Sequence, residues 1–179
     1  MTTTTRRTAV AASAVAATLL AAGTAHAAPT TTTSSAADCA PLHLVVVPGT
    51  TEIDENSSPD ADSGFFSRLT VPAMRDANSG DTPALERSYV PYPASFGGKP
   101  GDRSSATYAT SVQTGIDNAE AMIGDIAKKC PGTRVFVSGY SQGGQIASEV
   151  IREIGAGTGP IDADRFAGGA LFSDPTRGQ

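Results

Sequence analysis

The amino-acid sequence predicts an α/β fold built on a parallel, doubly wound sheet. After residue 38, short apolar runs rich in β-branched residues alternate with amphipathic helical segments, as they do in βαβ units. The first run, residues 42–47, is apolar almost throughout, which is typical of a strand covered on both faces. A second such run, residues 133–138, passes through a glycine-flanked serine into a helix. In sheets of this class, functional sites form at the carboxyl ends of the strands.

The first 27 residues have the composition of a removable export signal. Arg6 and Arg7 precede an apolar run over residues 8–22, and small residues surround a cleavage point after Ala27. The run is too short and too rich in alanine for a transmembrane helix, which needs about 20 apolar residues. We therefore expect a secreted protein without a transmembrane span. Residues 28–38, rich in threonine and serine, are expected to form a disordered linker.

Composition restricts what the remaining domain, residues 39–179, binds. This length suits one domain with a single core. The net charge of −5 and the acidic pI of about 4.9 argue against nucleic acid, because no basic stripe is present to neutralise phosphates. The sequence shows no cluster of metal ligands, and we expect no cofactor. We expect a monomer that recognises its substrate by shape and apolar contact.

The segments between the strands follow in order. A Pro-Gly turn and a polar loop lead to a short helix over residues 65–75, with Phe66, Leu69 and Met74 expected to face the core. Residues 85–90 then predict the second strand, which ends at a proline.

A longer helix precedes the third strand. Ser104 or Ser105 is expected to cap it, its apolar residues recur at spacings of three and four, and a Pro-Gly pair ends it. After the helix that follows the third strand, residues 166–172 predict a fourth strand.

The two cysteines predict one disulfide. Pairing is favoured in the oxidising compartments that exported chains reach. Cys39 and Cys130 each lie just before a predicted strand, which places both at the same edge of a parallel sheet. The alternative is a pair of free thiols.

Ser141 is the candidate nucleophile. Gly139 and Gly143 lie two positions on either side of it and leave room where the strand and the helix approach each other. The helix that begins after Ser141 directs its free N–H groups toward an oxyanion, with the Gln142 N–H as the expected first donor. The alternative is a glycine-rich turn in another kind of α/β domain.

From Cys39 onward the sequence resembles the cutinase family of serine esterases, in particular the secreted cutinase-like esterases of mycobacteria and their relatives. The matching segments span nearly all of residues 39–179: Cys39, Gly49-Thr50-x-Glu52, Tyr92-Pro93-Ala94-Ser95, Cys130-Pro131 and Gly139-Tyr140-Ser141-Gln142-Gly143.

The resemblance implies an α/β-hydrolase fold of the cutinase type and hydrolysis of lipid or other acyl esters through an acyl-enzyme. It implies Ser141 as nucleophile, with Thr50 and Gln142 forming the oxyanion hole. Pro48 departs from the family, which often has arginine at that position.

The base and the acid of a catalytic triad are not evident. The family places them after the serine, in the order Asp and then His. Here His26 falls in the predicted signal, and His43 begins the first strand, at the edge of the sheet away from Ser141, so that we expect a structural role for it. Asp174 follows the fourth strand, but it resembles the family's Gly-Asp-Pro strand ending, which is not the triad acid.

We therefore expect the triad Asp and His to lie beyond Gln179, in a longer serine esterase of which this sequence is a C-terminally incomplete piece. A serine hydroxyl is a weak nucleophile without a base, so the chain alone is expected to be nearly inactive. The alternative is a non-catalytic exported protein of the same fold that binds lipid or acyl chains.

Overall fold

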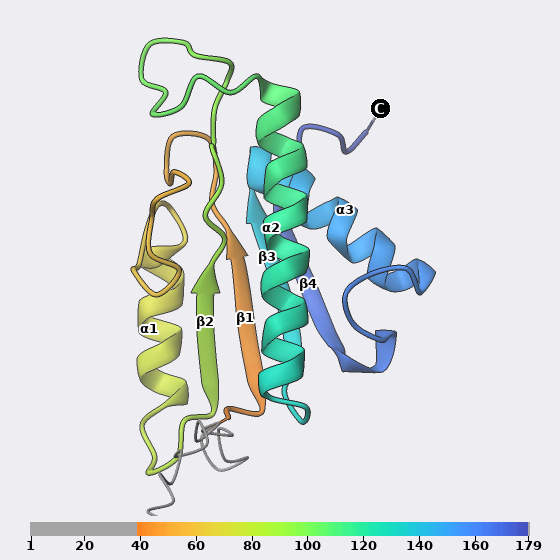
Figure 1. Cartoon of the computed structure of the whole chain (residues 1–179). Coiled ribbons are helices and arrows are strands. Elements are labelled where there is room, and N and C mark those ends of the chain that lie inside the picture. Colours follow the sequence, from red (N-terminus) through yellow and green to blue (C-terminus); the bar gives the residue numbers. More distant parts are fainter. Residues whose placement is uncertain (1–38, 179) are drawn as a thin grey trace, which may run out of the picture. The chain divides into compact units, whose positions relative to one another are not determined.

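The computed structural model describes residues 39–178, so that the predicted export signal and linker lie outside the described residues. All strand pairs in this part are parallel, and the strands lie in the order β2-β1-β3-β4 (Figure 1). The strands are β1 (Leu42–Val47), β2 (Leu85–Tyr89), β3 (Arg134–Tyr140) and β4 (Phe166–Phe172). The helices are α1 (Ser67–Ala77), α2 (Tyr108–Lys129), α3 (Gln142–Ala156) and a short 3-10 turn, Ala163–Arg165. The predicted fold class is confirmed.

Strand β1 occupies an inner position, as its continuous apolar sequence predicts. Leu42 pairs with Leu85 of β2 on one side and with Arg134 of β3 on the other. The last residues of β1 are completely buried, so both faces of the strand are covered. The register aligns Val47 with Gly139. The segments that follow β1 and β3 therefore leave the sheet at the same carboxyl edge.

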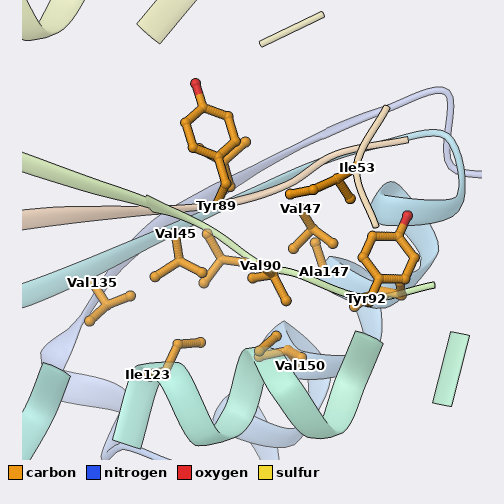
Figure 2. Packing of buried hydrophobic residues seen from close by; sticks show 14 of the residues in the cluster. Val45, Val47, Ile53, Tyr89, Val90, Tyr92, Ile123, Val135, Ala147 and Val150 are labelled. Atoms are coloured by element: carbon orange, nitrogen blue, oxygen red, sulfur yellow. The ribbon is translucent and has the colours of Figure 1, made fainter. Parts of the chain in front are cut away.

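The helices cover both faces of the sheet. Tyr89 of β2 points toward α1, where its hydroxyl lies 2.6 Å from that of Thr70. On the opposite face, Val45 and Val135 point toward Ile123 of α2, while Tyr89 points away from it (Figure 2). Helix α3 packs against both α2 and β3 on this face. The result is the three-layer arrangement of a doubly wound fold.

Two details of the predicted helices are wrong. Leu69 is 50% exposed, whereas its neighbour Thr70 is buried and donates to the carbonyl oxygen of Phe66 as well as contacting the tyrosine on β2. The tyrosine supplies a polar partner inside the interface, so a threonine is satisfied there. Phe66 is buried as expected.

The N-cap of α2 is Thr107, not Ser104 or Ser105. Its hydroxyl accepts the Thr110 N–H at 3.1 Å. The preceding residues stay in the loop because the Ser95 hydroxyl lies within hydrogen-bond distance of the carbonyl oxygens of Ser104 and Ala106. The contact with Ser95, which is distant from the helix start, thus makes α2 begin after the two serines that the local sequence favours as caps.

The predicted disulfide is confirmed. Cys39 and Cys130 are bonded, with their Cα atoms 5.7 Å apart. The bond joins the entry of β1 to the end of α2. The guanidinium of Arg165 donates to the carbonyl oxygens of Cys130 and Thr133, at 2.9 and 2.7 Å, and so holds the same turn from the other side.

The contact between α2 and α3 contains a pair of acidic side chains. Burial and the neighbouring carboxylates of Glu153 and Asp117 raise the pKa of Glu120 to about 7. An acid whose pKa is higher in the folded state binds its proton more tightly there than in the unfolded chain. The free energy of unfolding should therefore fall as pH rises from about 5 to about 8.

Urea unfolding over this pH range checks the expectation. Glu120→Gln should remove most of the fall, because an amide does not titrate, and Glu153→Gln should reduce it by removing the neighbouring charge. Glu149, which pairs with Arg152 on the surface at 2.6 Å, provides the control substitution Glu149→Gln. A slope that persists unchanged in both Glu120→Gln and Glu153→Gln would show that another group is responsible.

Candidate active site

Ser141 lies at the sharp turn between β3 and α3. Its backbone is in a sparsely populated region, with φ 55° and ψ −121°. The Ser141 N–H donates to the carbonyl oxygen of Phe172 at 2.9 Å, and the Ser141 carbonyl accepts the Gly144 N–H at 2.8 Å. The Ser141 hydroxyl forms no hydrogen bond within residues 39–178. Strain of this kind persists only where the surroundings fix the residue, and it accumulates at functional sites.

The two flanking glycines allow three backbone segments to meet. A Cβ added to Gly139 would lie 2.6 Å from the carbonyl carbon of Gly143 and closer to its oxygen. A Cβ added to Gly143 would lie 2.7 Å from the carbonyl carbon of Val47 and would also collide with the oxygen of Pro48. The start of α3 therefore packs directly on the end of β1, so that the segment after β1 lies next to Ser141.

A carboxylate fixes the loop that follows β1. Glu52 accepts the backbone N–H of Gly49 and that of Phe65, each at 2.7 Å, with its two oxygens. The Thr51 N–H donates to Ala94 at 2.8 Å. This anchor does not use the side chain of Pro48, the residue before Gly49. The sequence contained the glutamate in its matched motif, but gave no indication of its partners.

A buried tyrosine holds the end of β1 itself. The Tyr92 hydroxyl donates to the carbonyl oxygen of Pro48 at 2.6 Å. Burial raises the pKa of Tyr92 well above its ordinary value, so the phenol stays protonated and remains a donor.

Thr50 is buried in this anchored loop. Its hydroxyl oxygen has no hydrogen-bond partner among the described residues. Buried hydroxyl groups normally have a partner, and an exception calls for a functional explanation. Thr50 directly follows Gly49, which packs against the ring of Tyr140, the residue before Ser141.

Gln142 is held from both ends of its side-chain amide. Its oxygen accepts the Ser111 hydroxyl at 3.0 Å, and its nitrogen donates to the Ser95 carbonyl at 3.0 Å. The Ser95 N–H in turn donates to the Ser111 hydroxyl at 3.1 Å. Because Gln142 is the first residue of α3, its backbone N–H has no acceptor within the helix. The side-chain contacts fix the direction of that N–H.

An aromatic cluster adjoins the turn, and the sequence reasoning missed it. Phe65 stacks on Tyr140 with ring centroids 5.2 Å apart, and Phe66 contacts Phe172 edge to face at 5.4 Å. Phe65 and Phe172 are 44% and 41% exposed. The adjacent phenylalanines before α1 were the available signal, but the sequence did not show that they contact Tyr140 and Phe172.

His43 lies far from Ser141. It pairs in register with Val135, six residues before the serine, which corresponds to about 20 Å along a strand. Its ring nitrogens contact Ser88 and Glu86. No other histidine lies in the part of the chain that the structure describes.

Asp174 lies at the carboxyl edge, where its Cβ is close to Gly144 in the first turn of α3. One carboxylate oxygen accepts the N–H and hydroxyl of Thr176, at 2.9 and 2.8 Å. The other has no partner among residues 39–178.

Residues 39–178 contain neither a membrane-spanning helix nor a cluster of metal ligands. None of the helices there has the length and apolar character that crossing a bilayer requires. In the same range, no three His, Cys, Asp or Glu side chains come together as ligands for a metal ion.

The sequence is similar to esterases of bacteria and fungi. It is 27% identical over 143 residues to the carboxylesterase Culp6 homolog of Corynebacterium glutamicum, covering 78% of this chain and 45% of that protein. It is 33% identical over 144 residues to cutinase CUT2 of Pyricularia oryzae, covering 79% of this chain and 58% of that protein. The chain thus spans about half the length of these curated relatives.

Solved structures agree on the fold. An acetylxylan esterase superposes with a TM-score of 0.57 at 22% identity, covering 76% of this chain and 64% of that one. The catalytic core domain of an acetyl xylan esterase from Trichoderma reesei gives a TM-score of 0.54 at 28% identity, covering 76% and 65%. The family model described as Cutinase matches residues 38–179. The chain therefore belongs to the cutinase family.

Proposed function

We propose that this protein is a secreted carboxylic ester hydrolase that works through an acyl-enzyme on Ser141. The main support is the strained backbone of Ser141, with φ 55°, at the start of a helix and with a hydroxyl that is free of hydrogen bonds within the described residues. Such a serine is held in a conformation that only the surrounding packing maintains, and its hydroxyl is left available to attack.

In the proposed reaction, the Ser141 oxygen attacks the ester carbonyl while a general base takes the hydroxyl proton. The backbone N–H groups of Thr50 and Gln142 would stabilise the oxyanion. The Glu52 carboxylate, which accepts the Gly49 N–H at 2.7 Å, supports the first donor. The Ser95 and Ser111 contacts to the Gln142 amide support the second. The alcohol then leaves with a proton, and water releases the acid.

The substrate we propose is a lipid or another ester with an apolar acyl chain. The exposed rings of Phe65 and Phe172 provide an apolar surface beside Ser141. Burial of each methylene group on such a surface contributes about 0.8 kcal/mol.

We propose that the base and its acid come from residues beyond Gln179, in the order that the family uses. Within residues 39–178, the one histidine is about 20 Å from Ser141 by its register. A serine site without its base keeps only a residual acceleration, of order 10³ to 10⁴ over water, from the oxyanion hole and binding.

Hydrolysis of short p-nitrophenyl esters tests this proposal. The chain that ends at Gln179 should act barely above background, whereas a form extended by the codons that follow Gln179 should be active. In the extended form, Ser141→Ala should reduce kcat at least about a thousandfold while the protein remains folded. Ser79→Ala, at an exposed serine after α1, is the matched control and should keep full activity.

Two results would contradict the proposal. Robust turnover by the short chain, lost in Ser141→Ala, would show that a described residue supplies the base. An extended protein that binds lipid vesicles but hydrolyses esters of no acyl length would favour the non-catalytic binding protein.

A further inference from the structure

A cavity lies on the part of the sheet that is remote from Ser141. Its volume is about 670 Å³, and it is bounded by the start of β1, the middle of β2, the C-terminal half of α2, Met74 of α1 and the loop at residues 59–60. The residues that matter for its chemistry are His43, Glu86, Ser88, Met122, Ile126 and Lys129. None of them belongs to the site proposed above.

Three side chains in this cavity, from a serine, a histidine and a glutamate, contact one another in sequence, with the histidine in the middle. The His43 Nε2 atom lies 3.0 Å from the Ser88 hydroxyl oxygen. The His43 Nδ1 atom lies 3.4 Å from a Glu86 carboxylate oxygen. Glu86 and Ser88 share one face of β2 because they are two residues apart, and His43 pairs directly with Glu86 in the register.

The carboxylate determines which nitrogen carries the proton. An ionised glutamate can only accept a hydrogen bond, so the neutral ring places its proton on Nδ1. The Nε2 atom is then an acceptor and faces the Ser88 O–H. This is the arrangement in which an imidazole acts as general base toward a serine.

The surroundings keep the ring neutral and leave a cation in the cavity. Burial lowers the pKa of His43 below its ordinary value, which outweighs the opposing effects of Glu86 and Asp60, and Lys129 lowers it further. The ammonium group of Lys129 forms no ion pair within residues 39–178. Ser88 is only half-buried, so a small molecule in the cavity can reach its hydroxyl.

We propose that Ser88 is a second acyl-accepting serine, activated by His43 and Glu86, which reacts with small activated esters in this cavity. The Ser88 oxygen forms a bond to the acyl carbon while His43 Nε2 takes the hydroxyl proton. The bond from the acyl carbon to the leaving oxygen then breaks. The proton on His43 passes to the leaving group, so the products are O-acyl Ser88 and a free phenol or alcohol.

The lining of the cavity indicates the kind of ester. Met122 and Ile126 offer an apolar wall to a short acyl chain or an aromatic leaving group. Lys129 supplies positive charge for the carbonyl oxygen as it becomes negative. A small, apolar ester such as p-nitrophenyl acetate fits both features.

Labelling of the full chain that carries Ser141→Ala tests the proposal without interference from the first serine. After incubation with p-nitrophenyl acetate, intact mass and peptide mapping should show one acetyl group on Ser88, with release of one equivalent of p-nitrophenol. Ser79, exposed and without a histidine partner, is the internal control and should stay unlabelled. Adding Ser88→Ala should abolish the label. Absence of label on Ser88 would overturn the proposal.

The role of His43 as the general base is tested by two further measurements, the labelling rates of variants and the pH dependence of labelling. His43→Gln and Glu86→Gln should each slow acetylation of Ser88 at least about tenfold, since general bases contribute about 10² to 10⁴. Without these substitutions, the labelling rate should rise with pH through the pKa of His43, below its ordinary 6.5, and then become constant. A rate that keeps rising with hydroxide up to pH 10 would show an unassisted hydroxyl and overturn the base assignment, even if both variants fail to fold.

Discussion

Replacing Gly143 with alanine should reduce the free energy of unfolding by more than about 3 kcal/mol, and the protein should lose its cooperative transition near room temperature. The added Cβ would lie 2.7 Å from the carbonyl carbon of Val47, a distance that side chains do not adopt. Neither neighbour can move away easily, because β1 is hydrogen-bonded on both sides and the Pro48 carbonyl is held by the Tyr92 hydroxyl.

A second glycine in the same helix provides the control. Gly155, near the end of α3, has no atom within 4 Å of an added Cβ. Gly155→Ala should therefore stabilise the protein by about 0.5 to 1 kcal/mol through the lower entropy of the unfolded chain. Guanidinium unfolding followed by circular dichroism measures both. Equal stability of the two variants would mean that α3 does not pack on β1 as described.

Loss of the Cys39–Cys130 bond should destabilise the domain by about 4.5 kcal/mol in the chain-entropy treatment of a closed loop. The bond closes a loop of 91 residues, which contains β1, α1, β2 and α2. Without it, β1 and β2 must find β3 and β4 from a much larger set of unfolded conformations. Few small domains have enough reserve to remain folded after such a loss.

Two forms without the disulfide distinguish the effect of the missing bond from the effect of the changed side chains. The double variant Cys39→Ser/Cys130→Ser and the reduced, alkylated wild type should show similar drops in unfolding midpoint. If the midpoints of both forms match that of the oxidised protein, the bond contributes nothing measurable. If only the alkylated form unfolds, the added groups rather than the missing bond are responsible.

The sequence predicted those elements whose pattern is local. Residues 42–47 and 166–172 coincide with β1 and β4. The turn residues on either side of an apolar run mark where the strand begins and ends. The disulfide was predictable because both cysteines precede strands that must lie parallel. The close backbone contacts at Gly139 and Gly143 were predictable, because a side chain at either position would collide where the strand and the helix meet around Ser141.

The features that the sequence did not predict depend on partners far along the chain. Nothing near Glu52 indicates that one of its oxygens accepts the N–H of Phe65, thirteen residues later. The burial of Thr70 instead of Leu69 in α1 depends on Tyr89, which lies on strand β2. A pattern along one helix cannot contain that information.

The inner position of β1 also sets a time scale for the growing chain. Its partner β3 lies on the far side of α1, β2 and α2, and the two cysteines at the entries to these strands are separated by 91 residues. At roughly 5–20 residues per second, a ribosome needs about 5 to 20 s to make that stretch. During this interval the most apolar strand of the domain is synthesised but lacks one of its two neighbours. Until β3 has been made, residues 42–47 are therefore open to chaperones that recognise exposed apolar segments.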